Sequence, residues 1–253
     1  MRFAVISDLH SNLEALEAVL ADIDARGLET IYCLGDVVGY GPDPVPCVDL
    51  VMARCAFTIR GNHDDALFHG ADRFNPYARA AIDWTRDRIK PGFFRGKSNA
   101  ARWKFLEELP LEKKVGRHYF VHGSPRDHVN EYIYREDVFF NAEGKLRRIF
   151  DATDHVLFVG HTHLPVIIGS DLKTWVPGEL ESERRLDPAL KYIVNVGSVG
   201  QPRDRDPRAC WVEVEDELIR YHRVAYDVEA VRAKIARQRA LDPVLGTRLV
   251  EGT

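Results

Sequence analysis

The chain has 253 residues, 45% hydrophobic and 29% charged, an ordinary balance for one large globular domain or two small ones. A formal net charge of −4 argues against a surface devoted to nucleic acid, although it leaves room for a local basic pocket. No apolar run approaches the ~20 residues of a membrane span, and the sequence starts directly with a strand pattern. We therefore expect a cytoplasmic protein without signal peptide or membrane segment, built as a single domain over residues 1–253, with its four cysteines reduced.

The first part of the chain alternates strands with helices. Strands are predicted at residues 2–6, 30–34 and 55–60, and a short helix near residues 48–53. Another helix is expected from Ser11, because Ser11 and Glu14 have the spacing of a capping box and apolar residues follow at helical intervals as far as Gly27. This β-α-β-α-β order predicts a parallel sheet.

The remainder of the chain divides into a helical stretch and a strand-rich half. Helical patterns at residues 76–89 and 100–109 predict a helical insertion or lid at about residues 66–110. Strands follow at 117–121, 156–159, 166–168 and 192–196, with a hairpin near 210–224. Helices fit residues 136–150 and 228–239, and the residues after Leu241 are expected to form a loose tail.

Five predicted strands end in His, Asp or Asn, usually beside a glycine. These ends contribute seven oxygen and imidazole donors, namely Asp8, His10, Asp36, Asn62, His122, His161 and His163. Ligands bind at the carboxyl ends of strands in open α/β sheets. A donor set without thiolate suits Mn, Fe, Zn or Ni better than Ca or Mg. Seven donors exceed the needs of one tetrahedral ion and suit two divalent ions that share a carboxylate.

The ordered motifs DLH, GD, GNHD, HG and GHTH resemble those of the calcineurin-like metallophosphoesterase superfamily. The later segment GSVGQPR, residues 197–203, is similar to the small prokaryotic phosphodiesterase branch of that superfamily. The resemblance implies an α/β (α+β) fold, a four-layer αββα sandwich in which helices flank two mixed sheets. It also implies phosphodiester hydrolysis by a metal-bridging hydroxide at a dinuclear site.

The resemblance further implies a role for each matched position. Asp8, His10, Asp36 and His163 correspond to the ligands of a first metal, and Asp36, Asn62, His122 and His161 to those of a second. Asp36 would therefore bridge the two ions. His63 corresponds to a histidine that is not a ligand but acts on the leaving group. Asp36 and His63 are thus the expected catalytic residues.

One departure from the superfamily pattern concerns residues 35–41, which read GDVVGYG. Protein phosphatases of the superfamily carry GDxxDRG there, so Gly39 and Tyr40 stand where those enzymes have Asp and Arg. The missing Asp supports the catalytic histidine in those enzymes, and the missing Arg helps to hold phosphate. The departure disfavours a protein phosphatase.

Three further features leave alternatives open. Arg203 could bind a substrate phosphate through its guanidinium, or residues 202–208 could form a solvated loop of paired Arg and Asp. Asp64 could orient His63 or contact substrate. The segment from residue 86 to residue 104 contains one acidic residue, Asp87, and seven basic residues, namely Arg86, Arg88, Lys90, Arg95, Lys97, Arg102 and Lys104. They could form a basic lid for a nucleotide or a nucleic-acid end, or merely a solvated helix face.

The expected partner is a phosphoester small molecule or a nucleotide, with nucleic acid less favoured, and nothing in the sequence indicates the oligomeric state. Two other functions remain open. One is a phosphomonoesterase or a hydrolase of nucleotides or nucleic-acid ends. The other is an inactive scaffold of the same fold, which the intact set of seven donors disfavours.

Overall fold

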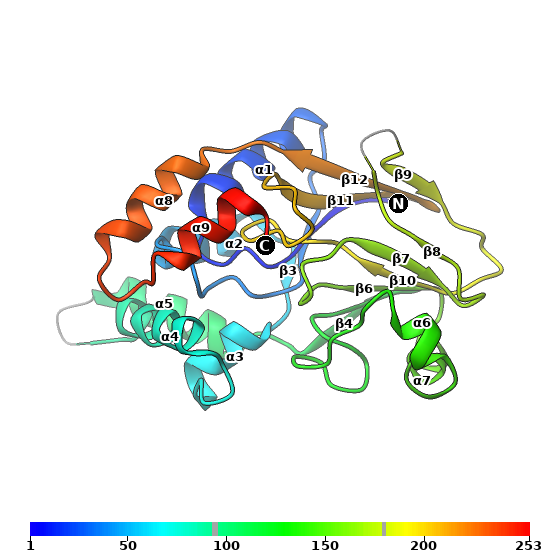
Figure 1. Ribbon diagram of the computed structural model, residues 1–253, viewed down its shortest axis with the longest axis horizontal. Coiled ribbons are helices and arrows are strands. Elements are labelled where there is room, and N and C mark those ends of the chain that lie inside the picture. The colour runs from blue at the N-terminus through cyan, green and yellow to red at the C-terminus, as the bar shows by residue number, and fades with distance from the viewer. Residues whose placement is uncertain (93–95, 179–180) are drawn as a thin grey trace.

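Two six-stranded mixed sheets form the centre of the computed structural model, which describes residues 1–92, 96–178 and 181–253 (Figure 1). In spatial order, the first sheet contains β3 (Phe57–Thr58), β2 (Ile31–Cys33), β1 (Arg2–Ile6), β11 (Ala209–Glu215), β12 (Leu218–Val224) and β9 (Glu183–Arg185). The second contains β4 (Glu112–Val115), β5 (His118–Val121), β6 (Val156–Val159), β10 (Tyr192–Asn195), β7 (Val166–Gly169) and β8 (Thr174–Trp175).

The alternation of side chains along β1 explains the layers. Phe3 and Val5 point into a core between the two sheets, where they meet Phe120 and Phe158 of the second sheet. Ala4 and Ile6 belong to a separate core, which joins the opposite face of the first sheet to helices α1 (Leu13–Ala25) and α2 (Pro44–Arg54). Because helices also cover the outer face of the second sheet, the predicted αββα sandwich is confirmed.

The helices over the second sheet form a broken run. It consists of α6 (Asp137–Phe140), the π-helix η1 (Ala142–Leu146) and α7 (Arg147–Asp151), which pack Leu146 and Ile149 against the sheet. The single helix predicted over residues 136–150 is therefore wrong. Gly144 lies inside this run, and glycine is a poor helix former, so a local change of winding costs little there.

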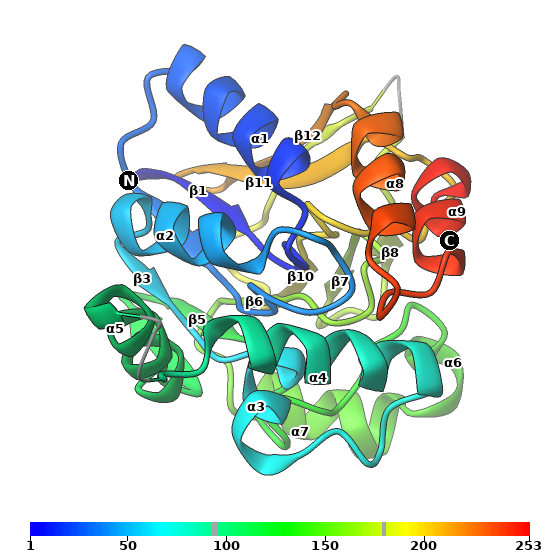
Figure 2. The same cartoon turned by 90° about the vertical axis from the view of Figure 1, so that its left-hand side faces the viewer.

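The remaining helices gather at one end of the sheets. Between β3 and β4 the chain forms α3 (Asn62–His69), α4 (Pro76–Ile89) and α5 (Gly96–Glu107). After the hairpin of β11 and β12 come α8 (Val228–Arg237) and α9 (Val244–Glu251). Figure 2 looks onto this end, with α4 across the front and α8 and α9 beside it. None of the helices in the described parts of the chain is long and apolar enough to cross a membrane.

Several predicted element boundaries are wrong. Helix α1 starts one residue later than expected, because Asn12 rather than Ser11 accepts the capping hydrogen bond, from the backbone of Ala15. The segment GNHDD, which follows the third predicted strand, forms the start of α3, a helix that had no prediction at these residues. The supposed loose tail contains α9, whose Leu245 and Leu249 are buried against Tyr40 and α8. The short strands β4, β8 and β9 had no prediction.

Parallel pairing brings the polar strand ends together. β1, β2 and β3 run parallel in the first sheet, as do β5, β6 and β10 in the second. Their carboxyl ends therefore share an edge within each sheet. The two sheets face one another, so both edges supply side chains to one place.

Candidate metal centre

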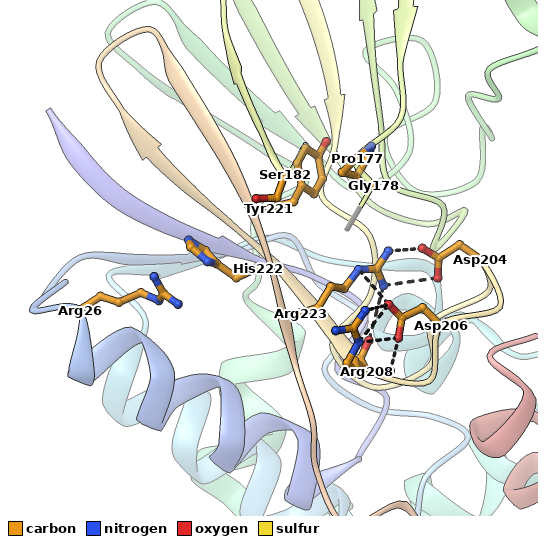
Figure 3. Close-up of a pocket in the computed structure, with 10 residues that line it drawn as sticks. All are labelled: Arg26, Pro177, Gly178, Ser182, Asp204, Asp206, Arg208, Tyr221, His222 and Arg223. Atoms are coloured by element: carbon orange, nitrogen blue, oxygen red, sulfur yellow. Dashed lines mark hydrogen bonds and ion pairs between the residues drawn. The ribbon is translucent and has the colours of Figure 1, made fainter. Parts of the chain in front are cut away.

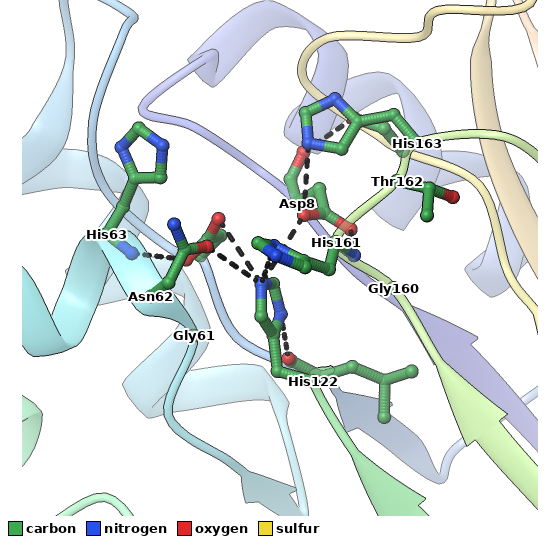
Figure 4. A network of polar contacts seen from close by, with 12 residues as sticks. Asp8, Gly61, Asn62, His63, His122, Gly160, His161, Thr162 and His163 are labelled. Carbon is green, nitrogen blue, oxygen red and sulfur yellow. Dashed lines mark hydrogen bonds and ion pairs between the residues drawn. The ribbon is translucent and has the colours of Figure 1, made fainter. Parts of the chain in front are cut away.

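The seven donors predicted from the sequence lie together at this common edge, and Figure 4 labels five of them, Asp8, Asn62, His122, His161 and His163. Asp8 and His10 follow β1, Asp36 follows β2, Asn62 opens α3, His122 follows β5, and His161 and His163 follow β6. The two carboxylates and four imidazoles are almost completely buried. The structure thus collects every predicted donor from five separate strand ends.

The backbone at this edge is unusual. Five non-glycine residues of the donor set, Asp8, His10, Asp36, His161 and His163, have positive φ angles between 48° and 66°. The left-handed region is unfavourable for residues with a Cβ, and such strain clusters at functional sites. The surrounding structure enforces it. The side chain of Asn195, for example, donates to the carbonyl of Gly160 and to the hydroxyl of Thr162, which fixes the turn between His161 and His163.

The donors form two clusters that meet at Asp36. In the first, His163 Nε2 lies 3.2 Å from Asp8 Oδ1 and 3.1 Å from His10 Nε2. His10 Nε2 lies in turn 3.7 Å from Asp36 Oδ2. These spacings are close to the ~3–3.5 Å between ligand atoms that each sit about 2.1 Å from one ion.

The second cluster lies on the other side of Asp36. His122 Nε2 lies 3.5 Å from Asp36 Oδ2, 3.1 Å from Asn62 Oδ1 and 3.2 Å from His161 Nδ1. The other oxygen of Asp36 accepts a hydrogen bond of 2.7 Å from the backbone N–H of His63. Asp36 is therefore held in place at the junction of the two clusters, with one oxygen facing both.

The outward nitrogen of each imidazole determines where the proton lies. Nδ1 of His10, His122 and His163 lies 3.2, 2.9 and 2.5 Å from the carbonyl oxygens of Val38, Leu34 and Gln201, and Nε2 of His161 lies 3.2 Å from that of Asn130. Carbonyl oxygens only accept, so these nitrogens donate. The four inward nitrogens then present lone pairs to one another, in pairs separated by 3.1 and 3.2 Å. Cations among them would relieve this repulsion, so the donor set fits metal ions.

Protonation of the imidazoles cannot by itself relieve the repulsion between the facing nitrogens. Burial, together with the neighbouring His122, lowers the pKa of His161 to about 3, and burial holds the pKa of His10 and His163 below its usual range. His122 differs. Although burial opposes its charge, the carboxylates of Asp36 and Asp8 raise its pKa to about 9. One protonated imidazole cannot relieve both pairs of facing nitrogens.

His63 stands beside the donor clusters, set apart from the other imidazoles in Figure 4. Its ring packs against Tyr40 and Phe74, with centroid distances of 4.5 and 4.9 Å. Its Nδ1 is buried against Gly39 and has no hydrogen-bond partner among the described residues. Burial lowers the pKa of His63 to about 4, so the ring is neutral near pH 7.

Asp64 makes no hydrogen bond to His63 in the described part of the chain and is not among the residues that line the cavity. Its carboxylate is fully buried and accepts hydrogen bonds from the backbone N–H groups of Gly61 and Val38. Burial and the nearby charge of Asp36 raise the pKa of Asp64 to about 7. Asp64 therefore closes the first turn of α3 and ties it to the loop after β2, a structural role.

A cavity of about 290 Å³ opens onto the two clusters. It is lined by Asp36, Tyr40, Asn62, His63, Arg73, Phe74, Asn75, Asn130, Tyr132, His161, His163 and Arg203. Arg203 is half-buried, and its Nη2 lies 3.0 Å from Gln201 Oε1 and 3.5 Å from the hydroxyl of Tyr40. No carboxylate of the described residues pairs with Arg203, so its charge is available to an anion. Arg73, Phe74 and Tyr132 were missed by sequence reasoning, because they carry no motif and come from loops.

The other arginines near Arg203 are arranged differently. Arg208 pairs with Asp206, and Arg223 pairs with Asp204. These four residues line a second cavity of about 450 Å³ on the far side of the 202–208 loop (Figure 3). Both of its aspartates are engaged in these ion pairs, and it holds none of the candidate metal ligands. The paired-loop alternative thus describes Arg208, whereas Arg203 faces the metal clusters.

The basic run at residues 86–104 does not line the cavity of the metal clusters in the described part of the chain. Arg86 donates to the carbonyls of Ala66 and Leu67, Arg102 forms two hydrogen bonds with Asp49, and Lys90 pairs with Asp87. These contacts favour the solvated helix face over a basic lid. Arg95 lies outside the described residues.

Comparisons with known proteins agree with this architecture. Residues 1–217 match the calcineurin-like phosphoesterase superfamily domain. An uncharacterised protein of Methanocaldococcus jannaschii is 39% identical over 261 residues, which cover 98% of this chain and 97% of that protein. The crystal structure of a metallophosphoesterase from Sphaerobacter thermophilus is also 39% identical and superposes with a TM-score of 0.82, covering 100% of this chain and 99% of that one. A hypothetical protein from Pyrococcus horikoshii shares the fold at 19% identity, with a TM-score of 0.73 and coverage of 100% and 98%. The chain therefore belongs to the calcineurin-like phosphoesterase superfamily.

Proposed function

We propose that this protein is a dinuclear metal-dependent phosphodiesterase. The observation that carries the proposal is the convergence of four imidazole lone pairs and two buried carboxylates, with every outward imidazole nitrogen tied to a backbone carbonyl. Such an array is costly unless cations occupy it. Membership of the phosphoesterase superfamily supports phosphoryl chemistry at those cations.

The proposed ligands form two groups, which are the two clusters defined by the distances between donor atoms. Asp8, His10, Asp36 and His163 would hold one divalent transition-metal ion, and Asp36, Asn62, His122 and His161 the other. Two such ions, whether Mn, Fe, Zn or Ni, would supply Lewis acidity toward the phosphoryl oxygens and activate water. The hydrogen bonds to the carbonyls of Val38, Leu34, Gln201 and Asn130 fix the orientation of the imidazoles and leave their inward nitrogens for the ions.

The other polar residues of the cavity act on the substrate. Arg203 carries an uncompensated positive charge into the cavity, and its guanidinium can bind a phosphoryl oxygen. His63 is neutral before substrate binds, and a phosphoryl anion beside it favours its charged form. The imidazole can then protonate the leaving oxygen or stabilise its negative charge.

A diester is favoured over a monoester by the charge of the cavity. Tyr40 occupies the place at which protein phosphatases of the superfamily carry an arginine, and its ring packs against His10 and His63. The cavity therefore lacks one cation that a dianionic monoester would use. A diester carries only one negative charge and makes a smaller demand on cations.

The test compares hydrolysis of bis-p-nitrophenyl phosphate with that of p-nitrophenyl phosphate. The protein is stripped with chelator and then given Mn, Ni, Zn or Mg in turn. We expect metal-dependent turnover of the diester, with two ions per chain by elemental analysis. Asp36→Asn and His63→Ala should lower kcat at least 100-fold.

A matched control is available on the same helix as His63. His69 is exposed, carries an ion pair with Asp65 and lies outside the cavity, so His69→Ala should retain wild-type turnover. Full activity of folded Asp36→Asn and His63→Ala variants would refute the proposed roles. Faster monoester hydrolysis would replace the diesterase with a monoesterase. Failure to bind any transition metal would leave an inactive scaffold.

A further inference from the structure

Two neighbouring tyrosines stand near the metal-centre cavity: Tyr132 is one of its lining residues, and Tyr134 lines a separate pocket of about 160 Å³. Tyr132 lines the cavity and stacks on the ring of His161, with centroids 3.9 Å apart and planes 22° apart. The plane of Tyr134 lies within 6° of that of Tyr132, at a centroid distance of 5.6 Å. The three rings therefore form a nearly parallel series that begins at a candidate metal ligand and runs outward.

Packing in the core does not explain why the rings of these two tyrosines are exposed to solvent. Tyr132 and Tyr134 are 40% and 41% exposed, whereas Ile133 between them is 3% exposed and belongs to the core under α7. The segment thus alternates outward, inward and outward. Neither hydroxyl makes a hydrogen bond to the described residues, so neither tyrosine is anchored through its polar end. Large flat rings left in solvent beside a ligand cavity are typical of a binding surface.

The rest of the cavity indicates what lies against these rings. Arg203 and Arg73 both line it, and neither pairs with a carboxylate of the described chain. An anionic group is therefore expected close to a flat aromatic one. The volume of about 290 Å³ is at the small end for ligand sites and suits a single nucleotide unit rather than a lipid chain.

We propose that Tyr132 and Tyr134 form a stacking platform for a nucleobase, so that the substrate is a nucleotide phosphoester. This inference rests on the proposed function, because the scissile phosphate is taken to lie between the metal clusters and Arg203. The base would then stack its π-face on the outer ring of the series, that of Tyr134, which Tyr132 supports from the side of His161. Stacking of one base on protein aromatics is worth roughly a 5- to 150-fold change in affinity, whatever the base.

The test compares two inhibitors that share a phosphate but differ in the base. AMP and ribose 5-phosphate compete with bis-p-nitrophenyl phosphate in the manganese-loaded enzyme, and their inhibition constants are expressed as a ratio. We expect AMP to bind at least 5-fold more tightly than ribose 5-phosphate. Because both inhibitors are measured against the same substrate in each variant, the ratio is independent of changes in KM.

Four variants separate stacking from structural damage. Tyr132→Ala and Tyr134→Ala should bring the ratio close to one, whereas Tyr134→Phe keeps the ring and should preserve it. Since Tyr132 contacts His161, the metal content of Tyr132→Ala must be measured, and Tyr134→Ala provides the independent arm. Phe139→Ala is the matched control, because Phe139 is 74% exposed in the following helix but does not line the cavity.

The outcomes distinguish a failure of the proposed stacking platform from a failure of the proposed esterase function. Equal inhibition by AMP and ribose 5-phosphate in an active enzyme would overturn the platform alone. So would an AMP preference that survives both alanine substitutions. Absence of turnover with every phosphoester would overturn the proposed function instead. In that case, calorimetric binding of AMP and ribose 5-phosphate to the metal-loaded protein still decides the platform.

Discussion

Gly39 leaves the space in which the ring of His63 lies, and filling that space tests whether the position of His63 matters. A Cβ on Gly39 would stand 2.3 Å from Nδ1 and 3.0 Å from Cγ of His63. Ordinary van der Waals contact begins at 3.4 Å, so in Gly39→Ala the imidazole must move by about 1 Å. A misplacement of ~1 Å at a reacting group can cost about 100-fold in rate.

The same substitution also strains the backbone, and this effect needs its own control. Gly39 has a φ of +93°, and Gly27, at the end of α1, has a φ of +69° and open space around it, so that a Cβ there would meet no atom within 4 Å. Each alanine therefore costs ~1–2 kcal/mol of backbone strain, but only one meets His63. We expect both variants to lose thermal stability, Gly39→Ala more than Gly27→Ala because of the added clash with buried His63, with a fall in kcat of about 100-fold in Gly39→Ala alone.

The assay is metal-dependent turnover of bis-p-nitrophenyl phosphate, with the melting temperature and metal content of each variant measured in parallel. If Gly39→Ala keeps the kcat of Gly27→Ala while two ions remain bound, the position of His63 does not control the reaction. A loss of metal from Gly39→Ala would instead place the damage in the ligand clusters, since His10 also packs against His63.

Three further predictions concern stability. Burial would raise the pKa of Glu213, but hydrogen bonds from Arg2 and His222 outweigh it and hold that pKa below its usual range. The stability that ionised Glu213 provides is therefore present above about pH 4.5, and it is lost as the pH falls through the lowered pKa. In urea unfolding, Glu213→Gln should cost about 1–3 kcal/mol at pH 7 and progressively less below pH 4.5, and a pH-independent difference would contradict this account. Leu249→Ala should destabilise the protein by about 2–5 kcal/mol, whereas exposed Val250→Ala on the same helix should have little effect; equal effects would mean that α9 is not packed. Chelator should lower the melting temperature and added Mn should restore it, because ions stabilise only the folded donor array; an unchanged melting temperature would argue against bound ions.

The candidate metal centre was predictable because its signals are local. Each donor follows a predicted strand, and parallel strands end at one edge, so sequence position was enough to bring Asp8 and Asp36 together within the first sheet, whereas His122 follows a strand of the second sheet. The αββα layers came from the family resemblance, since alternation along β1 does not by itself reveal a second sheet. The local sequence pattern was also enough to predict α4, which begins and ends at the expected residues.

The errors arose where the deciding contact is distant in sequence. Helix α9 is short and gains its burial from Tyr40 and from α8, which no local pattern reveals. The run of basic residues suggested a lid because the sequence shows charge but not pairing, and Asp49 lies far from Arg102 in the chain. Asp64 resembled a catalytic neighbour because its backbone partner Val38 belongs to another loop.

The pairing of β1 with β11 has a consequence for biosynthesis. One neighbour of β1 in the first sheet, β2, follows it closely in the chain, whereas the other, β11, is synthesised long after it. Asp8, Asp36 and His122 lie in the first half of the chain and His161 and His163 in the second, so neither half of the nascent chain can assemble both donor clusters. Such long-range pairing makes folding slow relative to helical proteins. Uptake of ions by a chain of this topology would therefore report that the strands of both sheets have been synthesised, and termination before β11 would leave β1 without one of its two neighbours.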